Sequence, residues 1–155
     1  MSERPYPNGI DCLWIASDRN GHLAAFVTGG EGPIPIKLLL EDAIRVEDIG
    51  QRVCELPVSS AVKMLVQMKF PEDFMELAKR GVFVYDWTDV HRVSSECRGA
   101  YEPVAVPLGP TAQNILPPTL MNIAKIVTFT DVAFSDNKPL DVRKHEKCRY
   151  GEWLS

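Results

Sequence analysis

The densest group of side chains that could do chemistry lies in one short segment, Asp86 to Arg92 (DWTDVHR). The carboxylates of Asp86 and Asp89 and the imidazole of His91 could bind a divalent cation or carry out acid–base chemistry. Both aspartates are equally suited to turns, in which they accept hydrogen bonds from backbone amides, and their spacing matches no metal-binding loop. We therefore favour a structural role and keep a small enzyme or ligand-binding protein using Asp86, Asp89 and His91 as the alternative.

A second feature is the glycine-rich stretch that contains Gly29, Gly30 and Gly32. Glycine-rich loops hold phosphates when they open a helix whose backbone amides face the ligand. This stretch lacks the spacing of such loops, and two prolines, Pro33 and Pro35, follow it in place of a helix. The pattern predicts a rigid connector or a contact loop, and we expect no nucleotide or other cofactor.

The cysteines are widely separated and form no C-x-x-C pair; they are Cys12, Cys54, Cys97 and Cys148. No histidine stands at zinc-ligand spacing from any of them, so we expect no metal site. Cys12 and Cys54 have apolar neighbours typical of buried thiols. Cys148 stands between Lys147 and Arg149, whose charges would lower the pKa of its thiol. No cysteine or serine lies in a nucleophile-elbow pattern, so we expect the protein not to be an enzyme.

Composition limits what the elements around these residues can build. The chain has 155 residues, of which 45% are hydrophobic and 25% charged, which predicts one folded domain spanning residues 1–155. The formal charge of −4 disfavours nucleic acid as a ligand and favours a basic partner, although mild acidity is also ordinary for soluble proteins. No apolar run reaches the ~20 residues that a membrane span needs. Because the N-terminal residues lack signal-peptide features, we expect a cytoplasmic protein with reduced cysteines.

The clearest local structure is an N-terminal β-hairpin. Two apolar segments, residues 11–17 and 22–28, flank the dipeptide Asn20-Gly21, which tolerates the positive φ angles of a tight turn. The segments carry Trp14, Ile15 and Phe26, residue types that suit the surface of a sheet.

Hydrophobic periodicity and the placement of proline and glycine predict the remaining elements. Helices are predicted over residues 46–56, 71–81 and 117–125. Strands are predicted over residues 82–87, as a central strand, over 101–107, at an edge or with its prolines at strand ends, and over 126–134. Residues 36–45 and 61–68 fit helix or strand, and the tail after Asp141 is loosely patterned and basic. Together these predict an α+β fold whose antiparallel or mixed sheet begins with the hairpin and carries its helices on one face.

Two stretches of the sequence resemble a group of small bacterial proteins. They are residues 21–35 (GHLAAFVTGGEGPIP) and 77–89 (LAKRGVFVYDWTD). Some members of this group resemble immunity proteins encoded beside secreted polymorphic toxins. The resemblance implies a cytoplasmic protein that binds its cognate toxin domain and blocks the active site or the entry of substrate.

If a toxin domain presents a basic cleft, acidic side chains of an immunity protein can occupy it with large coupling energies. On physical grounds the candidates for this contact are Glu31 in the glycine–proline loop and Asp86 and Asp89 at the end of the central strand. Trp87 is either a core residue or a half-exposed anchor of the interface. A structural subunit of a larger complex is a third possibility, for which the sequence offers no specific mark.

Overall fold

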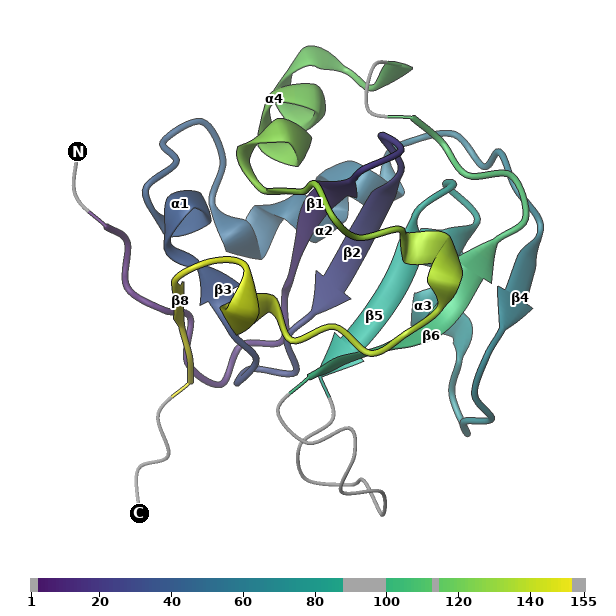
Figure 1. The fold of residues 1–155 in the computed structure, drawn as a ribbon, viewed down its shortest axis with the longest axis horizontal. Coiled ribbons are helices and arrows are strands. Elements are labelled where there is room, and N and C mark those ends of the chain that lie inside the picture. The colour runs from purple at the N-terminus through teal and green to yellow at the C-terminus, as the bar shows by residue number, and fades with distance from the viewer. Residues whose placement is uncertain (1–2, 88–99, 113–114, 152–155) are drawn as a thin grey trace.

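The computed structural model describes residues 3–87, 100–112 and 115–151. Its main feature is a mixed sheet of six strands in the order β4-β6-β5-β2-β1-β7 (Figure 1). The strands, in chain order, are β1 (Leu13–Asp18), β2 (Leu23–Val27), β4 (Val62–Met64), β5 (Phe83–Trp87), β6 (Tyr101–Pro107) and β7 (Thr128–Phe129). The predicted α+β class, with a mixed sheet that begins near the N-terminus, is confirmed.

The N-terminal hairpin forms as predicted. β1 and β2 pair antiparallel from Leu13 opposite Val27 to Ser17 opposite Leu23. Gly21 adopts a φ of 77° in the connecting turn, a conformation that glycine reaches without steric cost. The buried carboxylate of Asp18 accepts hydrogen bonds from the backbone amides of Asn20 and His22, both at 2.9 Å, and so holds the turn.

β5 is a central strand, as predicted, because it pairs with β2 in parallel and with β6 antiparallel. Of the two placements predicted for residues 101–107, the edge was wrong, since β6 lies between β5 and β4, whereas Pro107 does stand at the end of its strand. β6 tolerates Pro103 because β4 pairs only with residues 105–107, so no strand lies opposite the nitrogen of Pro103. The backbone of Tyr101 bonds to Leu140 and so faces away from β5, and the nitrogen of Pro103, two residues further along, faces the same way.

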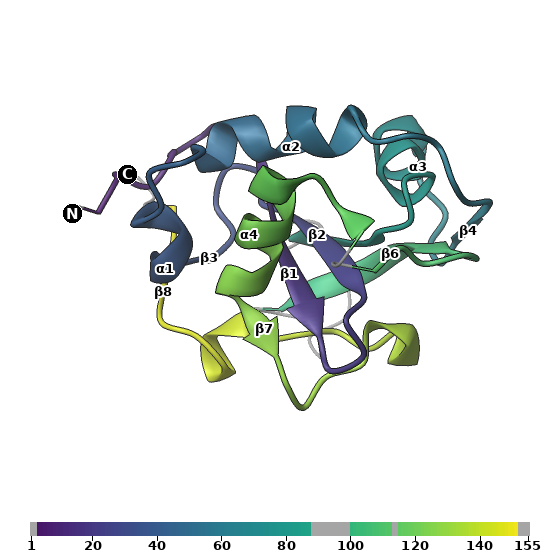
Figure 2. The same ribbon diagram turned by 90° about the horizontal axis from the view of Figure 1, so that it is seen from above.

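The helices pack on one face of the sheet. α2 (Val46–Cys54) contacts β1, and α3 (Glu72–Ala78) contacts β5 and β6, so that both lie along the same side in the view from above (Figure 2). α4 (Pro118–Ile126) also packs on β1, where the Ser17 hydroxyl donates to the Ala124 carbonyl at 2.6 Å. Alternate residues of a strand share a face, so Ser17 points to the same side as Leu13, which meets α2 at Gly50.

The opposite face of the sheet carries a stack of buried aromatic rings. Trp14 stacks on Phe26 with ring centroids 4.2 Å apart, and Phe26 stacks on Tyr85 at 4.9 Å. Phe134, which begins a 3₁₀ helix (Phe134–Asp136), closes the stack edge-on to Tyr85 at 5.8 Å. The continuous strand predicted over residues 126–134 is therefore wrong, because the chain leaves β7 after Phe129 and crosses this face of the sheet (Figure 1).

The remaining elements are short. Residues 36–45, which fitted helix or strand, begin with α1 (Ile36–Leu39), whereas residues 61–68 contain the strand β4. The C-terminal tail is more ordered than its sequence pattern indicated. A 3₁₀ helix (Val142–Lys144) leads into β8 (Cys148–Arg149), which pairs antiparallel with β3 (Ile34–Pro35). Within the described ranges, no helix has the length and apolar character of a membrane span.

Candidate functional site

The sheet topology brings three of the four predicted contact residues to one end of the sheet. β2 and β5 run in parallel with Val27 opposite Asp86, so the loop that follows β2 and the last residues of β5 emerge together. This loop carries Glu31, and β5 ends with Asp86 and Trp87. The fourth predicted residue, Asp89, and the imidazole of His91 lie outside the described residues.

Asp86 and Trp87 nevertheless project to opposite faces of the sheet, because consecutive residues of a strand alternate. Trp87 lies opposite Tyr101 in the β5–β6 register, on the face of the aromatic stack. Asp86 lies opposite Glu102 and beside Val27, on the face that carries the helices. The two residues therefore belong to different surfaces, although they are adjacent in sequence.

Trp87 is half-buried, so it is neither a fully buried core residue nor a fully exposed one. Its ring meets the buried ring of Tyr101 edge-on, with centroids 5.3 Å apart. Its Cβ and Cγ also lie 2.9 Å from the position that a Cβ on Gly32 would occupy. The glycine–proline loop packs closely on the body of the protein, and Gly32 is required because the loop passes directly over Trp87 and Tyr101.

Two tyrosine hydroxyls hold this loop in place by hydrogen bonds to its backbone carbonyls. Tyr101 donates to the Pro33 carbonyl at 2.9 Å and accepts from the Trp14 indole at 3.3 Å, and Tyr6 donates to the Gly32 carbonyl at 2.6 Å. Burial raises the pKa of both phenols above their ordinary value, so both stay protonated donors at neutral pH. Glu31 is held in place by its backbone, which accepts from Gly151 at 3.0 Å and donates to Thr28.

The C-terminal segment adds two residues that the sequence analysis did not select. The guanidinium of Arg143 lies 6.0 Å from the ring centre of Trp87 and 5.8 Å from that of Tyr150. The carboxylate of Asp141 accepts a hydrogen bond from Arg143 Nε at 2.9 Å, which raises the pKa of Arg143. Tyr150 is 47% exposed. We refer to Glu31, Trp87, Arg143 and Tyr150 as the sheet-end surface.

The cysteine predictions were partly wrong. Cys54 is exposed on α2 rather than buried, whereas Cys12 is half-buried and its pKa is raised by burial. The pKa of Cys148 is raised to about 12, not lowered, because burial of the thiol and the nearby Glu146 carboxylate outweigh the charge of Arg143. Cys97 lies outside the described residues. In the described ranges, no group of three or more His, Cys, Asp or Glu side chains has the arrangement of a metal site.

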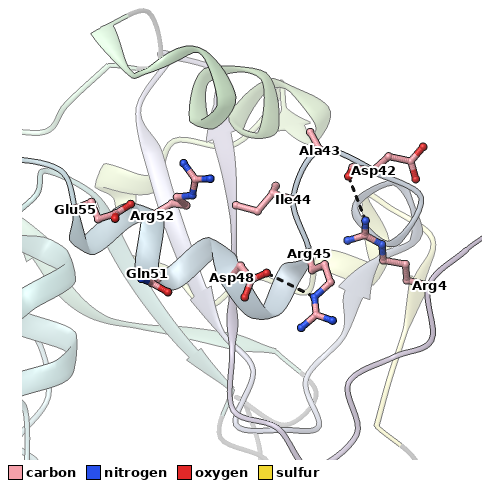
Figure 3. A pocket seen from close by; sticks show the side chains of 9 residues that line it. All are labelled: Arg4, Asp42, Ala43, Ile44, Arg45, Asp48, Gln51, Arg52 and Glu55. Carbon is pink, nitrogen blue, oxygen red and sulfur yellow. Dashed lines mark hydrogen bonds and ion pairs between the residues drawn. The ribbon is translucent and has the colours of Figure 1, made fainter.

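A polar pocket of about 460 Å³ lies beside α2 and is lined by three arginines, Arg4, Arg45 and Arg52 (Figure 3). Arg45 forms an ion pair with Asp48 at 3.5 Å, and Arg4 donates to the Asp42 carbonyl at 3.2 Å. The three guanidinium groups point in different directions in Figure 3, and three carboxylates share the lining. The charges therefore balance locally, and the pocket does not concentrate donors on an anion.

No protein-family model, curated protein or solved structure that was compared with this chain matches it.

Proposed function

We propose that the protein binds and neutralises a cognate secreted toxin domain, and that the sheet-end surface is its contact. The observation that carries this proposal is the meeting of Trp87, Arg143 and Tyr150, from distant parts of the chain, beside the carboxylate-bearing loop of Glu31. Tryptophan, tyrosine and arginine are the residue types that dominate the binding energy of protein interfaces. A rigid loop beside them adds a carboxylate for a basic cleft.

Preorganisation also favours this surface. The loop is held by the hydroxyls of the buried Tyr101 and the partly buried Tyr6 and by a backbone hydrogen bond from Gly151, so little order needs to be gained on binding. The Arg143 guanidinium is oriented by Asp141 and flanked by two aromatic rings. A partner that presents an apolar rim around a basic cleft would cover Tyr150 and Trp87 and pair with Glu31.

The experiment is recovery of a tagged protein from its native bacterium at moderate salt, with identification of the retained proteins by mass spectrometry. We expect a stoichiometric basic domain of a larger secreted protein. Tyr150→Ala should reduce its retention by about tenfold or more, as truncation of an interface anchor does. Ile115→Ala is the matched control, because it also removes an exposed apolar side chain but lies away from this surface.

The recovered domain is then expressed alone in a test host. Growth arrest that is relieved by co-expression of the wild-type protein, and less by Tyr150→Ala, supports neutralisation. Recovery of the protein with a bound metal or small molecule and no partner contradicts the proposal and favours the ligand-binding alternative. Equal retention by Tyr150→Ala and Ile115→Ala would remove the sheet-end surface from the interface.

A further inference from the structure

A groove of about 650 Å³ lies on the helix-bearing face of the sheet, between α2 and α3. Its floor is apolar and includes Leu13 of β1 and Leu77 of α3, which are only 8% and 5% exposed. Phe74 is partly buried in the same lining, whereas Phe70, just before α3, is 73% exposed. A phenylalanine left this open beside an apolar floor is typical of a surface that a partner covers.

The rim of this groove is acidic. Carboxylates of Asp11, Glu47 and Asp73 line it from three separate elements: the segment before β1, the first turn of α2 and the first turn of α3. We call the whole feature the acidic groove. Asp86 pairs with Val27 and projects to the same face of the sheet, but it is not among the residues that line the groove.

Arg80 is the single cation among the described residues that line the groove, and its guanidinium is already engaged in an ion pair and hydrogen bonds. Its guanidinium forms an ion pair with Glu76 at 2.7 Å and donates to the carbonyls of Cys54 and Leu56 at 3.0 and 3.2 Å. These contacts tie the C-terminal ends of α2 and α3 together. Three further cations lie around the groove: Arg45 pairs with Glu47 at 3.7 Å, Lys79 pairs with Glu76 at 2.9 Å, and the Lys69 ammonium lies 5.8 Å from the ring centre of Phe70. Asp11 and Asp73 are the rim carboxylates that form no ion pair with another described residue, and their negative charge attracts a basic ligand and disfavours an acidic one.

We propose that the acidic groove binds an amphipathic helical segment of a protein partner, with one or two apolar anchors flanked by lysine or arginine. An apolar floor between two helices is the shape that helix-in-groove recognition uses, in which side chains at i, i+3 and i+4 or i+7 fill the floor. The acidic rim selects basic flanks by charge complementarity. A second copy of this chain fits poorly, since two acidic rims would repel each other. The inference stands independently of the proposed toxin contact, which uses the opposite face.

The test uses a synthetic amphipathic peptide of about 18 residues, built from leucine and lysine, and a matched peptide with each lysine replaced by glutamate. Binding is measured by fluorescence anisotropy as a function of salt. Cys54 provides a local readout, because it is exposed and lines the groove. In a Cys97→Ser background, its alkylation by N-ethylmaleimide should slow when the lysine peptide is bound.

Two substitutions test the groove itself. Phe70→Ala should weaken binding of the lysine peptide by about tenfold, because a truncated apolar anchor costs about 1.4 kcal/mol or more. Asp73→Asn should weaken binding severalfold and reduce its dependence on salt. Ile115→Ala and Tyr150→Ala are the matched controls, because both change exposed side chains outside the groove. Phe70 and Asp73 are exposed, so unchanged thermal unfolding is expected for both variants.

Tight binding of the lysine peptide, loss of binding on Phe70→Ala and protection of Cys54 would together support the proposal. Equal binding of the lysine and glutamate peptides, or an unprotected Cys54, would overturn it. Protection of Cys54 that increases with protein concentration in the absence of peptide would also overturn it, in favour of self-association. A response to Tyr150→Ala, but not to Phe70→Ala, would place the peptide on the sheet-end surface and equally refute the groove as its site.

Discussion

Asp18 is predicted to hold two distant parts of the fold together, and its substitution by asparagine tests this role. The side chain is 2% exposed. Oδ1 accepts from the backbone amides of Asn20 and His22 at 2.9 Å, and Oδ2 accepts from the backbone amide of Phe134 at 2.8 Å. In Asp18→Asn, Oδ1 can keep the two hairpin bonds, but an NH₂ group then faces the Phe134 amide. Two donors would oppose each other at a buried position.

The expected loss in the free energy of unfolding follows from the single hydrogen bond that is lost, the one from the Phe134 amide. A hydrogen bond to a charged group contributes about 1.5–3 kcal/mol, and a buried donor left without an acceptor costs about 1–3 kcal/mol. Removal of a buried charge relieves part of this cost, so we expect the free energy of unfolding to fall by about 2–3 kcal/mol. With an m-value near 2 kcal/mol/M, the urea midpoint should fall by about 1–1.5 M.

The assay is equilibrium unfolding in urea, followed by tryptophan fluorescence. Asp136→Asn is the control, because it makes the same chemical change at an exposed residue of the 3₁₀ helix that Phe134 begins. Hydrogen exchange of the Phe134 amide gives a local measure, since this amide should lose protection well before the hairpin amides do. If both variants unfold at the same urea concentration, or if Phe134 keeps its protection, the assigned role of Asp18 is wrong.

Two further perturbations follow from the same packing. Gly32→Ala places a Cβ 2.6 Å from the Tyr101 hydroxyl and 2.9 Å from Trp87, so we expect a loss of about 1–3 kcal/mol in calorimetric stability; Gly109→Ala, whose nearest contact would be 3.7 Å, should lose little, and equal losses would contradict the argument. Burial raises the folded-state pKa of Tyr85 and Tyr101, so their stabilising effect is complete below pH about 10 and is lost as the pH rises above it. Tyrosinate absorbance from these residues should therefore appear together with unfolding in an alkaline titration, and ionisation within a folded protein would refute this.

The elements that could be predicted from sequence are those with local signals. The turn at Asn20-Gly21 defined the hairpin, and the proline and charge pattern around α3 defined that helix. Pairing between segments that are distant in sequence has no such signal. The parallel contact of β2 with β5 and the position of β6 inside the sheet became evident only from the structure.

Contacts between distant segments were also missed at the candidate site. The sequence identified Glu31 and Trp87, but nothing in it placed Arg143 against the Trp87 ring, because the basic tail has no periodicity that would indicate how it packs. The pKa of Cys148 was assigned the wrong direction for the same reason, since its basic neighbours are evident in sequence while its burial against β3 is not. The separation of Asp86 from Trp87 was accessible in principle, because the two-residue period of a strand requires it.

That separation determines how the two proposed surfaces relate to each other. Asp86 lies on the side of the acidic groove and Trp87 on the side of the sheet-end surface, with the thickness of the sheet between them. A flat or convex partner cannot cover both, whereas a partner with a basic cleft could enclose the end of the sheet and reach both faces. If two separate partners bind, Phe70→Ala should weaken only the partner in the acidic groove, and Tyr150→Ala only the partner on the sheet-end surface. A single enclosing partner should be weakened by both substitutions, and the two losses of binding free energy should add, because the two side chains lie on opposite faces and share no contact.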